Sequence, residues 1–225
     1  MGTKERRTRE RQETRERILS AAREMFADEG YESVTMRAIA ERIEYTPTAI
    51  YHHFDSKQAL LTELCACDFR GLADHFRGHA VSADPVERIR AVGRAYLEFA
   101  EKYPSQYRFM FMTVLPDPEM PEGYVQENKG IPERDAYAFL RHACQEAIDA
   151  GRIRKELRHA DQLAQILWGC VHGQVSLRIV NAKKGGPKAA QKHGSWVPWH
   201  DLRETTELMM DVLLRGMLIA PGRKS

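Results

Sequence analysis

The sequence lacks any apolar run of the roughly 18 residues that a membrane-spanning helix requires. Its first stretch, MGTKERRTRERQETRERI, is charged throughout and has no apolar segment of the kind that a secretory signal carries. Four cysteines in 225 residues, without such a signal, are not typical of a disulfide framework. We therefore expect a cytoplasmic protein with reduced thiols and no membrane segment.

Catalytic motifs are also missing. We find no nucleophile elbow, no glycine-rich phosphate loop and no H-E-x-x-H spacing. Cys65 and Cys67 lie two apart in a helical stretch and point to different sides, so they make a poor metal pair. The sequence predicts neither an enzyme nor a cofactor nor a metal site. A helical small-molecule enzyme using Cys144 and His172 from separate helices is the alternative.

Charge alone does not identify a partner, because the net charge is only +2. Residues 1–17 hold seven basic and four acidic side chains, whereas residues 18–57 hold four basic and seven acidic ones. These two imbalances cancel. Nucleic-acid binding would therefore depend on individually placed contacts and on the basic N-terminal segment.

Apolar residues recur at helical spacing along most of the chain, and no strand-like alternation is present. The pattern predicts an all-α fold of about nine helices. We expect a flexible basic arm over residues 1–13, a head over 14–56 that begins with Thr14 as a helix cap, and a larger helical domain over 57–220. Gly30 and Gly151 are expected to end helices in the left-handed conformation.

Residues 35–54, TMRAIAERIEYTPTAIYHHF, indicate two short helices joined by a tight turn. Thr35 and Thr46 are suited to cap their N-termini, and Pro47 suits the first position of the second helix. One face of that helix carries Thr48, Tyr51 and His52, with Ala49 and His53 beside it, and this small, polar face suits insertion into a DNA major groove. The alternative is a helical hairpin that only closes a core.

The segments TRERILSAAREMFADEGYESVT and MRAIAERIEYTPTAIYHHFDSKQALL resemble the DNA-binding head of the tetracycline-repressor family. The resemblance implies a helix-turn-helix and a set of operator contacts: Thr35, Arg37, Thr46, Pro47, Thr48, Ala49, Tyr51, His52, His53 and Lys57. Glu44 occupies the turn position where the family usually has glycine. Its turn must therefore either avoid a positive φ or carry strain.

The last two predicted helices carry apolar residues on more than one face, which favours pairing with a second copy in a four-helix interface. The residues expected there are Leu163, Leu167, Cys170, Met209, Leu213, Gly216 and Met217. The family resemblance implies the same homodimer.

An aromatic-rich set indicates either a filled core or a ligand pocket with a few polar groups. Its members are Phe69, Leu72, Tyr96, Phe99, Tyr103, Tyr107, Phe111, Phe139, Cys144, Trp168 and His172. Trp168, His172 and Gly173 match the Trp-x-x-x-His-Gly pattern of one effector-binding subgroup. The resemblance implies a regulator, most often a repressor, released from an inverted-repeat operator by a small, largely apolar ligand. A constitutive DNA-binding protein without an effector is the alternative.

Overall fold

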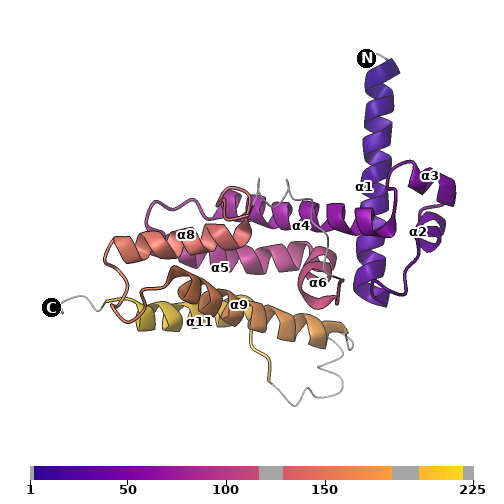
Figure 1. Ribbon diagram of the computed structural model, residues 1–225. Helices are drawn as coiled ribbons and strands as arrows, with labels where there is room; N and C mark the ends of the chain where they lie inside the picture. The colour runs from indigo at the N-terminus through magenta and orange to yellow at the C-terminus, as the bar shows by residue number, and fades with distance from the viewer. Residues whose placement is uncertain (1–2, 117–128, 184–197, 220–225) are drawn as a thin grey trace. The chain divides into compact units, whose positions relative to one another are not determined.

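The computed structural model describes residues 3–116, 129–183 and 198–219. Those residues contain nine helices and no strand, apart from an isolated bridge between Ile153 and Leu218 (Figure 1). The helices are α1 Thr3–Glu29, α2 Met36–Arg42, α3 Pro47–Tyr51, α4 Lys57–His79, α5 Pro85–Lys102, α6 Pro104–Met112, α8 Ala136–Asp149, α9 Ala160–Lys183 and α11 Leu202–Met217. The predicted all-α fold is confirmed, and none of the described helices combines the length and the apolar character that a bilayer span requires.

The chain forms two compact units. Unit 1 comprises Met1–Phe69 with Tyr103–Gln126, and unit 2 comprises Arg70–Lys102 with Glu127–Ser225. This division differs from the boundary that we placed at residue 57, because the first part of α4 and all of α6 belong with the head.

Helix α1 begins far earlier than the sequence predicted. It is helical from Thr3, so the flexible arm expected over residues 1–13 is wrong for residues 3–13. Ion pairs one turn apart, such as Arg6–Glu10 and Arg9–Glu13, favour the helix in a segment that has no apolar stripe. Thr14 is not a cap, since its hydroxyl donates to the Glu10 carbonyl from inside the helix.

Aromatic residues build the core of unit 1. Phe26 of α1 lies 5.2 Å from the ring of Tyr31 and 6.3 Å from the ring of Phe109 on α6, measured between centroids. Tyr107 of α6 is fully buried as well. Helix α6 therefore completes the core on which α1 is packed, which explains why it groups with the head.

Unit 2 is a helical bundle in which α5 contacts α8, α9 and α11, and α9 contacts α8 and α11. Gly93 of α5 lies against α11, where an added Cβ would lie 3.1 Å from the Met210 sulfur. Gly93 thus permits the two helices to pack tightly. The last turns of α4 join this bundle through Phe76, whose ring lies 6.4 Å from Tyr96 and 6.3 Å from Phe139.

Helix ends follow the expected chemistry at most positions. Gly30 and Gly151 adopt φ values of 85° and 67°, as predicted. At the start of α4 the Ser56 hydroxyl accepts the backbone N–H of Ala59 at 3.0 Å. Gln58 accepts a hydrogen bond from the Tyr31 hydroxyl at 3.2 Å.

Candidate nucleic-acid interface

Two capped helices and one strained residue form the α2–α3 hairpin. The Thr35 hydroxyl accepts the N–H of Ala38 at 3.1 Å, and the Thr46 hydroxyl accepts that of Ala49 at 3.3 Å, which confirms both predicted caps. Between the helices Glu44 has φ 62°, so this residue adopts the left-handed conformation and the turn carries strain. A left-handed backbone at a residue other than glycine costs about 1–2 kcal/mol.

Helix α3 buries one side and exposes the other. Ile50 is fully buried, whereas Thr48, Tyr51 and His52 are exposed, with Tyr51 at 51%. Helix α3 and its C-terminal cap His52 therefore present hydroxyl, phenol and imidazole groups to solvent. These are donors and acceptors suited to base edges and phosphate oxygens.

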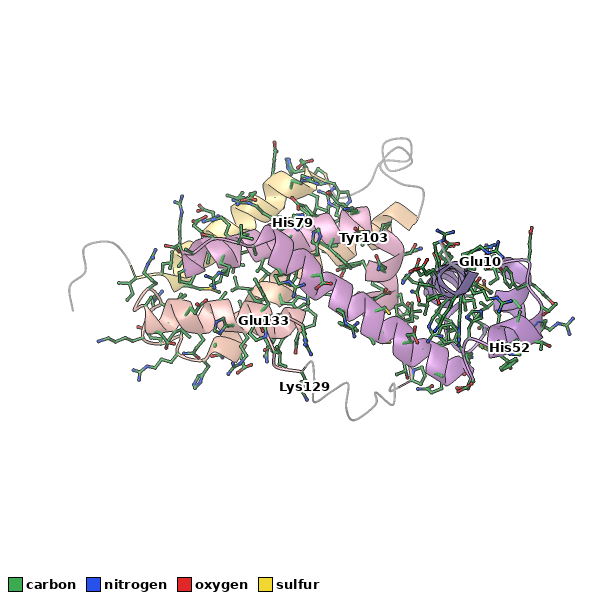
Figure 2. All side chains as sticks on the ribbon, turned by 90° about the horizontal axis from the view of Figure 1, so that it is seen from above. Glu10, His52, His79, Tyr103, Lys129 and Glu133 are labelled. Carbon is green, nitrogen blue, oxygen red and sulfur yellow. The ribbon has the colours of Figure 1, made fainter. Side chains whose placement is uncertain are left out.

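An open groove lies between α1 and the end of α3, lined by Glu10, Arg11, Thr14, His52 and His53. Figure 2 shows Glu10 and His52 on the two sides of this region. Burial, with Arg11, Arg15 and His52 nearby, holds the pKa of His53 below its ordinary value. His53 is therefore a neutral imidazole at neutral pH, with one donor and one acceptor nitrogen. Sequence reasoning missed the contribution of Arg11, because α1 was expected to begin only at Thr14.

The remaining predicted DNA contacts have defined partners in the free protein. The guanidinium of Arg37 donates to Glu41 at 2.9 Å, and both side chains are well exposed. The Lys57 ammonium donates to the backbone carbonyls of Tyr31 at 2.8 Å and Val34 at 3.0 Å. Two of its three N–H groups are thus engaged within unit 1, and a phosphate contact would use the third.

Arginines on α1 fix the hairpin in place. Arg15 pairs with Glu63 of α4, donates to the His53 carbonyl at 2.6 Å and lies 4.1 Å from the Phe54 ring centroid. Arg17 lies over the Tyr45 ring at 5.2 Å and donates to the Ile43 carbonyl. Because both contacts hold the backbone on either side of α3, the exposed face is presented by a supported element.

The predicted ligand residues do not all fall in one unit. Four belong to unit 1: Phe69, Tyr103, Tyr107 and Phe111. Seven belong to unit 2: Leu72, Tyr96, Phe99, Phe139, Cys144, Trp168 and His172. Three of the unit 1 members are in ring contact: the centroid of Phe111 lies 6.0 Å from that of Phe69, edge to face, and 5.2 Å from that of Tyr107.

A hydrogen-bonded chain runs through the aromatic members of unit 2. The Tyr96 hydroxyl lies 2.9 Å from His172 Nδ1 and accepts the indole N–H of Trp168 at 3.3 Å, while Ser176 lies 3.1 Å from His172 Nε2. Tyr96 is buried, whereas Trp168 is 38% exposed. Burial lowers the pKa of His172, so its ring is neutral at neutral pH. Cys144 is fully buried and its thiol pKa is raised to about 12, which removes the thiolate that a Cys–His catalyst would need.

The apolar surface that is exposed to a second copy differs in part from the predicted one. Leu163, Leu167 and Met217 are already buried inside unit 2, so they are not available to a partner. The exposed or half-exposed stripe on α9 and its neighbour α11 is instead made of Ile166, Gly169, Cys170, Gly173, Leu177, Leu208, Met209, Val212, Leu213 and Gly216. Cys170, Met209, Leu213 and Gly216 are the predicted residues that remain on it.

Comparison with known proteins gives two family matches in order along the chain. Residues 18–64 match the family described as bacterial regulatory proteins, tetR family, and residues 89–192 match a tetracyclin repressor-like C-terminal domain. The HTH-type transcriptional regulator UidR of Escherichia coli K12 is 41% identical over 83 residues, which is 37% of this chain and 39% of that protein. The HTH-type transcriptional activator FasR of Mycolicibacterium smegmatis is 32% identical over 102 residues, or 45% and 47% of the two chains. The matches thus span less than half the length of these relatives.

The fold is shared over a much longer stretch. The crystal structure of the TetR family regulator PfmR from Thermus thermophilus superposes with a TM-score of 0.64 over 88% of this chain and 94% of its own, at 19% identity. The two family matches cover the helix-turn-helix and most of the helical bundle that the structure describes. This chain therefore belongs to the tetR family of bacterial regulatory proteins.

Proposed function

We propose that the protein binds an inverted-repeat DNA operator as a homodimer and is released from it by a small, largely apolar ligand. Such a protein acts on chromosomal DNA and so works in the cytoplasm. The observation that carries the proposal is the exposed polar face of α3, held by Arg15 and Arg17 beside the groove that Arg11 lines. Released in this way, the protein would act as a repressor; one of the relatives is named as an activator.

Base reading is assigned to the exposed side chains of α3 and to Arg37 of α2. Thr35, Thr46 and Tyr51 suit phosphate oxygens: capping uses the acceptor capacity of each threonine hydroxyl and leaves its O–H able to donate. Arg37 must leave Glu41 to reach a base, which costs little because an exposed pair of this kind contributes at most about 1 kcal/mol.

The dimer is assigned to the stripe on α9 and α11. Leu208 and Val212 are 66% and 61% exposed one turn apart on α11, and Leu177 is 53% exposed on α9. Gly169, Gly173 and Gly216 on the same helices allow close helix approach. A dimer of this kind places two α3 helices against successive major grooves, about 34–36 Å apart, which requires an inverted repeat.

The ligand site is assigned to the Tyr96–His172–Trp168 chain, where a half-exposed indole lies beside the buried Tyr96 and the half-buried His172. Both ring nitrogens of His172 are engaged, by Tyr96 and Ser176, so a carbonyl or hydroxyl on an otherwise apolar ligand would bind by taking the place of one of these partners. The proposal assigns the chain to the Trp-x-x-x-His-Gly subgroup, whose pattern Trp168, His172 and Gly173 match. By linkage, a releasing ligand binds free protein more tightly than DNA-bound protein, typically by about 5–150-fold.

Selection of bound sequences from random DNA tests the DNA assignment. We expect an enriched inverted repeat, and recovery of unenriched DNA would contradict it. Small-molecule screening by Trp168 fluorescence then tests release, with Trp168→Ala to identify the reporting indole. Equal ligand affinities with and without operator would favour a constitutive DNA-binding protein.

A further inference from the structure

Three potential metal ligands meet on two helices of unit 2, away from the Tyr96–His172 chain. His75 and His79 lie one turn apart on α4, and Glu98 lies on α5. One donor atom from each lies within 4.8 Å of the other two. The imidazole centroids of His75 and His79 are 4.0 Å apart, and His79 is labelled in Figure 2 near the end of α4.

The backbone already orients both imidazoles. Nδ1 of His79 lies 2.7 Å from the His75 carbonyl oxygen, and because a carbonyl only accepts, Nδ1 carries the proton. The lone pair of His79 is therefore on Nε2. The His75 ring is hydrogen-bonded to the backbone of Ala95 on α5. A ring N–H donated to a backbone carbonyl is the usual outer support of a metal-binding histidine.

Charged and aromatic side chains from α5 and α11 surround the cluster, with Lys102 of α5 near His75. Arg203 of α11 lies 3.9 Å from a Glu98 oxygen but makes its shorter contact with Glu101. Phe99 closes one side, with its ring 5.8 Å from that of His75. A divalent cation would replace the weak Arg203 contact as the partner of the Glu98 carboxylate.

We propose that His75, His79 and Glu98 bind a divalent first-row transition-metal ion of the zinc, cobalt and nickel class. Two imidazole nitrogens and one carboxylate oxygen suit these ions, whereas magnesium and calcium prefer oxygen ligands alone. Three protein ligands leave at least one coordination position for water or an external ligand. Because His79 is exposed and the other two are half-buried, an ion can enter from solvent.

Binding requires only a small contraction of the cluster. With metal–nitrogen bonds of about 2.0–2.1 Å, ligand atoms around a tetrahedral ion lie roughly 3.3 Å apart. The three donor atoms lie up to 4.8 Å apart without the ion. Rotation about the side-chain bonds of the exposed His79 and the half-exposed Glu98 can bring them to the shorter separation that an ion requires. The bound ion would join the end of α4 to α5, so it should stabilise unit 2. This site does not depend on the proposed function.

The test is a titration of the full chain with cobalt(II), followed by its visible d–d absorption and by the melting temperature. Cys67→Ser serves as the parent protein, because Cys67 is an exposed thiol that can itself bind these ions. We expect stoichiometric binding by the parent, a melting temperature that rises with cobalt, and competition by zinc. His79→Gln should weaken the affinity by at least about tenfold, since outer-support changes alone cost about 10–100-fold.

The matched control is His142→Gln. His142 of α8 is also exposed and lies 3.7 Å from a glutamate, Glu146, one turn away, but it does not belong to the three-ligand cluster. This control should bind cobalt as the parent does. Glu98→Gln should lose affinity as His79→Gln does while remaining folded without metal. No cobalt binding by the parent, or equal binding by the parent and His79→Gln, would overturn the proposal.

Discussion

The guanidinium of Arg23 donates two hydrogen bonds of 2.7 Å to the carboxylate of Asp68, which is fully buried. Gln106 of α6 donates to the same carboxylate at 3.1 Å. One acidic side chain thus holds α1, the first part of α4 and α6 together within unit 1. The pairing is invisible in the sequence, because its partners lie far apart along the chain.

Replacing Asp68 should strongly destabilise the protein. Asp68→Ala leaves the Arg23 guanidinium and the Gln106 amide without their shared acceptor in a buried site, which costs about 3–5 kcal/mol in the free energy of unfolding. Urea denaturation followed by circular dichroism measures it. Glu41→Ala, which removes the exposed partner of Arg37, should change the same quantity by less than about 1 kcal/mol. Similar losses in both variants would contradict the assigned role of Asp68.

Relieving the strain at Glu44 should stabilise the head. Glu44→Gly accommodates φ 62° without the steric cost that a side chain incurs, and we expect a gain of about 0.5–1 kcal/mol after the entropy cost of glycine. Glu44→Ala is the matched control, because it removes the same carboxylate but retains the strain. Denaturation midpoints compare the three proteins. A gain in the alanine variant equal to that in the glycine variant would assign the effect to charge.

His172 should make stability depend on pH. Its folded pKa is lowered by burial, so below the ordinary value of about 6.5 the unfolded state binds more protons than the folded state. Stability is therefore lost as the pH falls from about 6.5 towards the folded pKa. Between about pH 7.5 and pH 5.5 the melting temperature should fall less for His172→Asn than for the wild type. In Ser176→Ala, which keeps the imidazole, the melting temperature should fall over this pH range as much as in the wild type.

A charge on the exposed stripe of α11 should prevent dimerisation. Val212→Asp would bury an unpaired carboxylate in the proposed interface, and sedimentation at micromolar concentration should then show a monomer. Val81→Asp is the control, since Val81 is 78% exposed before α5 and outside the stripe. It should sediment as the wild type does. A monomeric wild type, or a dimeric Val212→Asp variant, would contradict the assigned interface.

Local signals in the sequence predicted the hairpin well. Caps at Thr35 and Thr46 and left-handed ends at Gly30 and Gly151 depend on one residue and its immediate neighbours, and the structure confirms them. The helical start of α1 was missed because ion pairs, rather than an apolar stripe, mark it.

The packing of helices that lie far apart in the sequence could not be predicted from such local signals. Helix α9 is apolar on two faces, and only packing shows that the face with Leu163 and Leu167 is used inside unit 2. The His75–His79 spacing was visible in the sequence, but its third ligand comes from another helix. The candidate ligand residues divide between the two units for the same reason: composition does not specify which helices pack together.

The most direct test of the account is the affinity of His52→Ala for the selected inverted repeat and for a scrambled duplex at one salt concentration. His52 is exposed at the end of α3, so its loss should cost about 1–3 kcal/mol on the inverted repeat and leave the scrambled duplex unchanged. Fluorescence anisotropy with labelled duplexes measures both. The ratio of the affinity for the inverted repeat to that for the scrambled duplex should be lower for His52→Ala than for the wild type. Equal wild-type affinity for the two duplexes would contradict sequence-specific binding through α3.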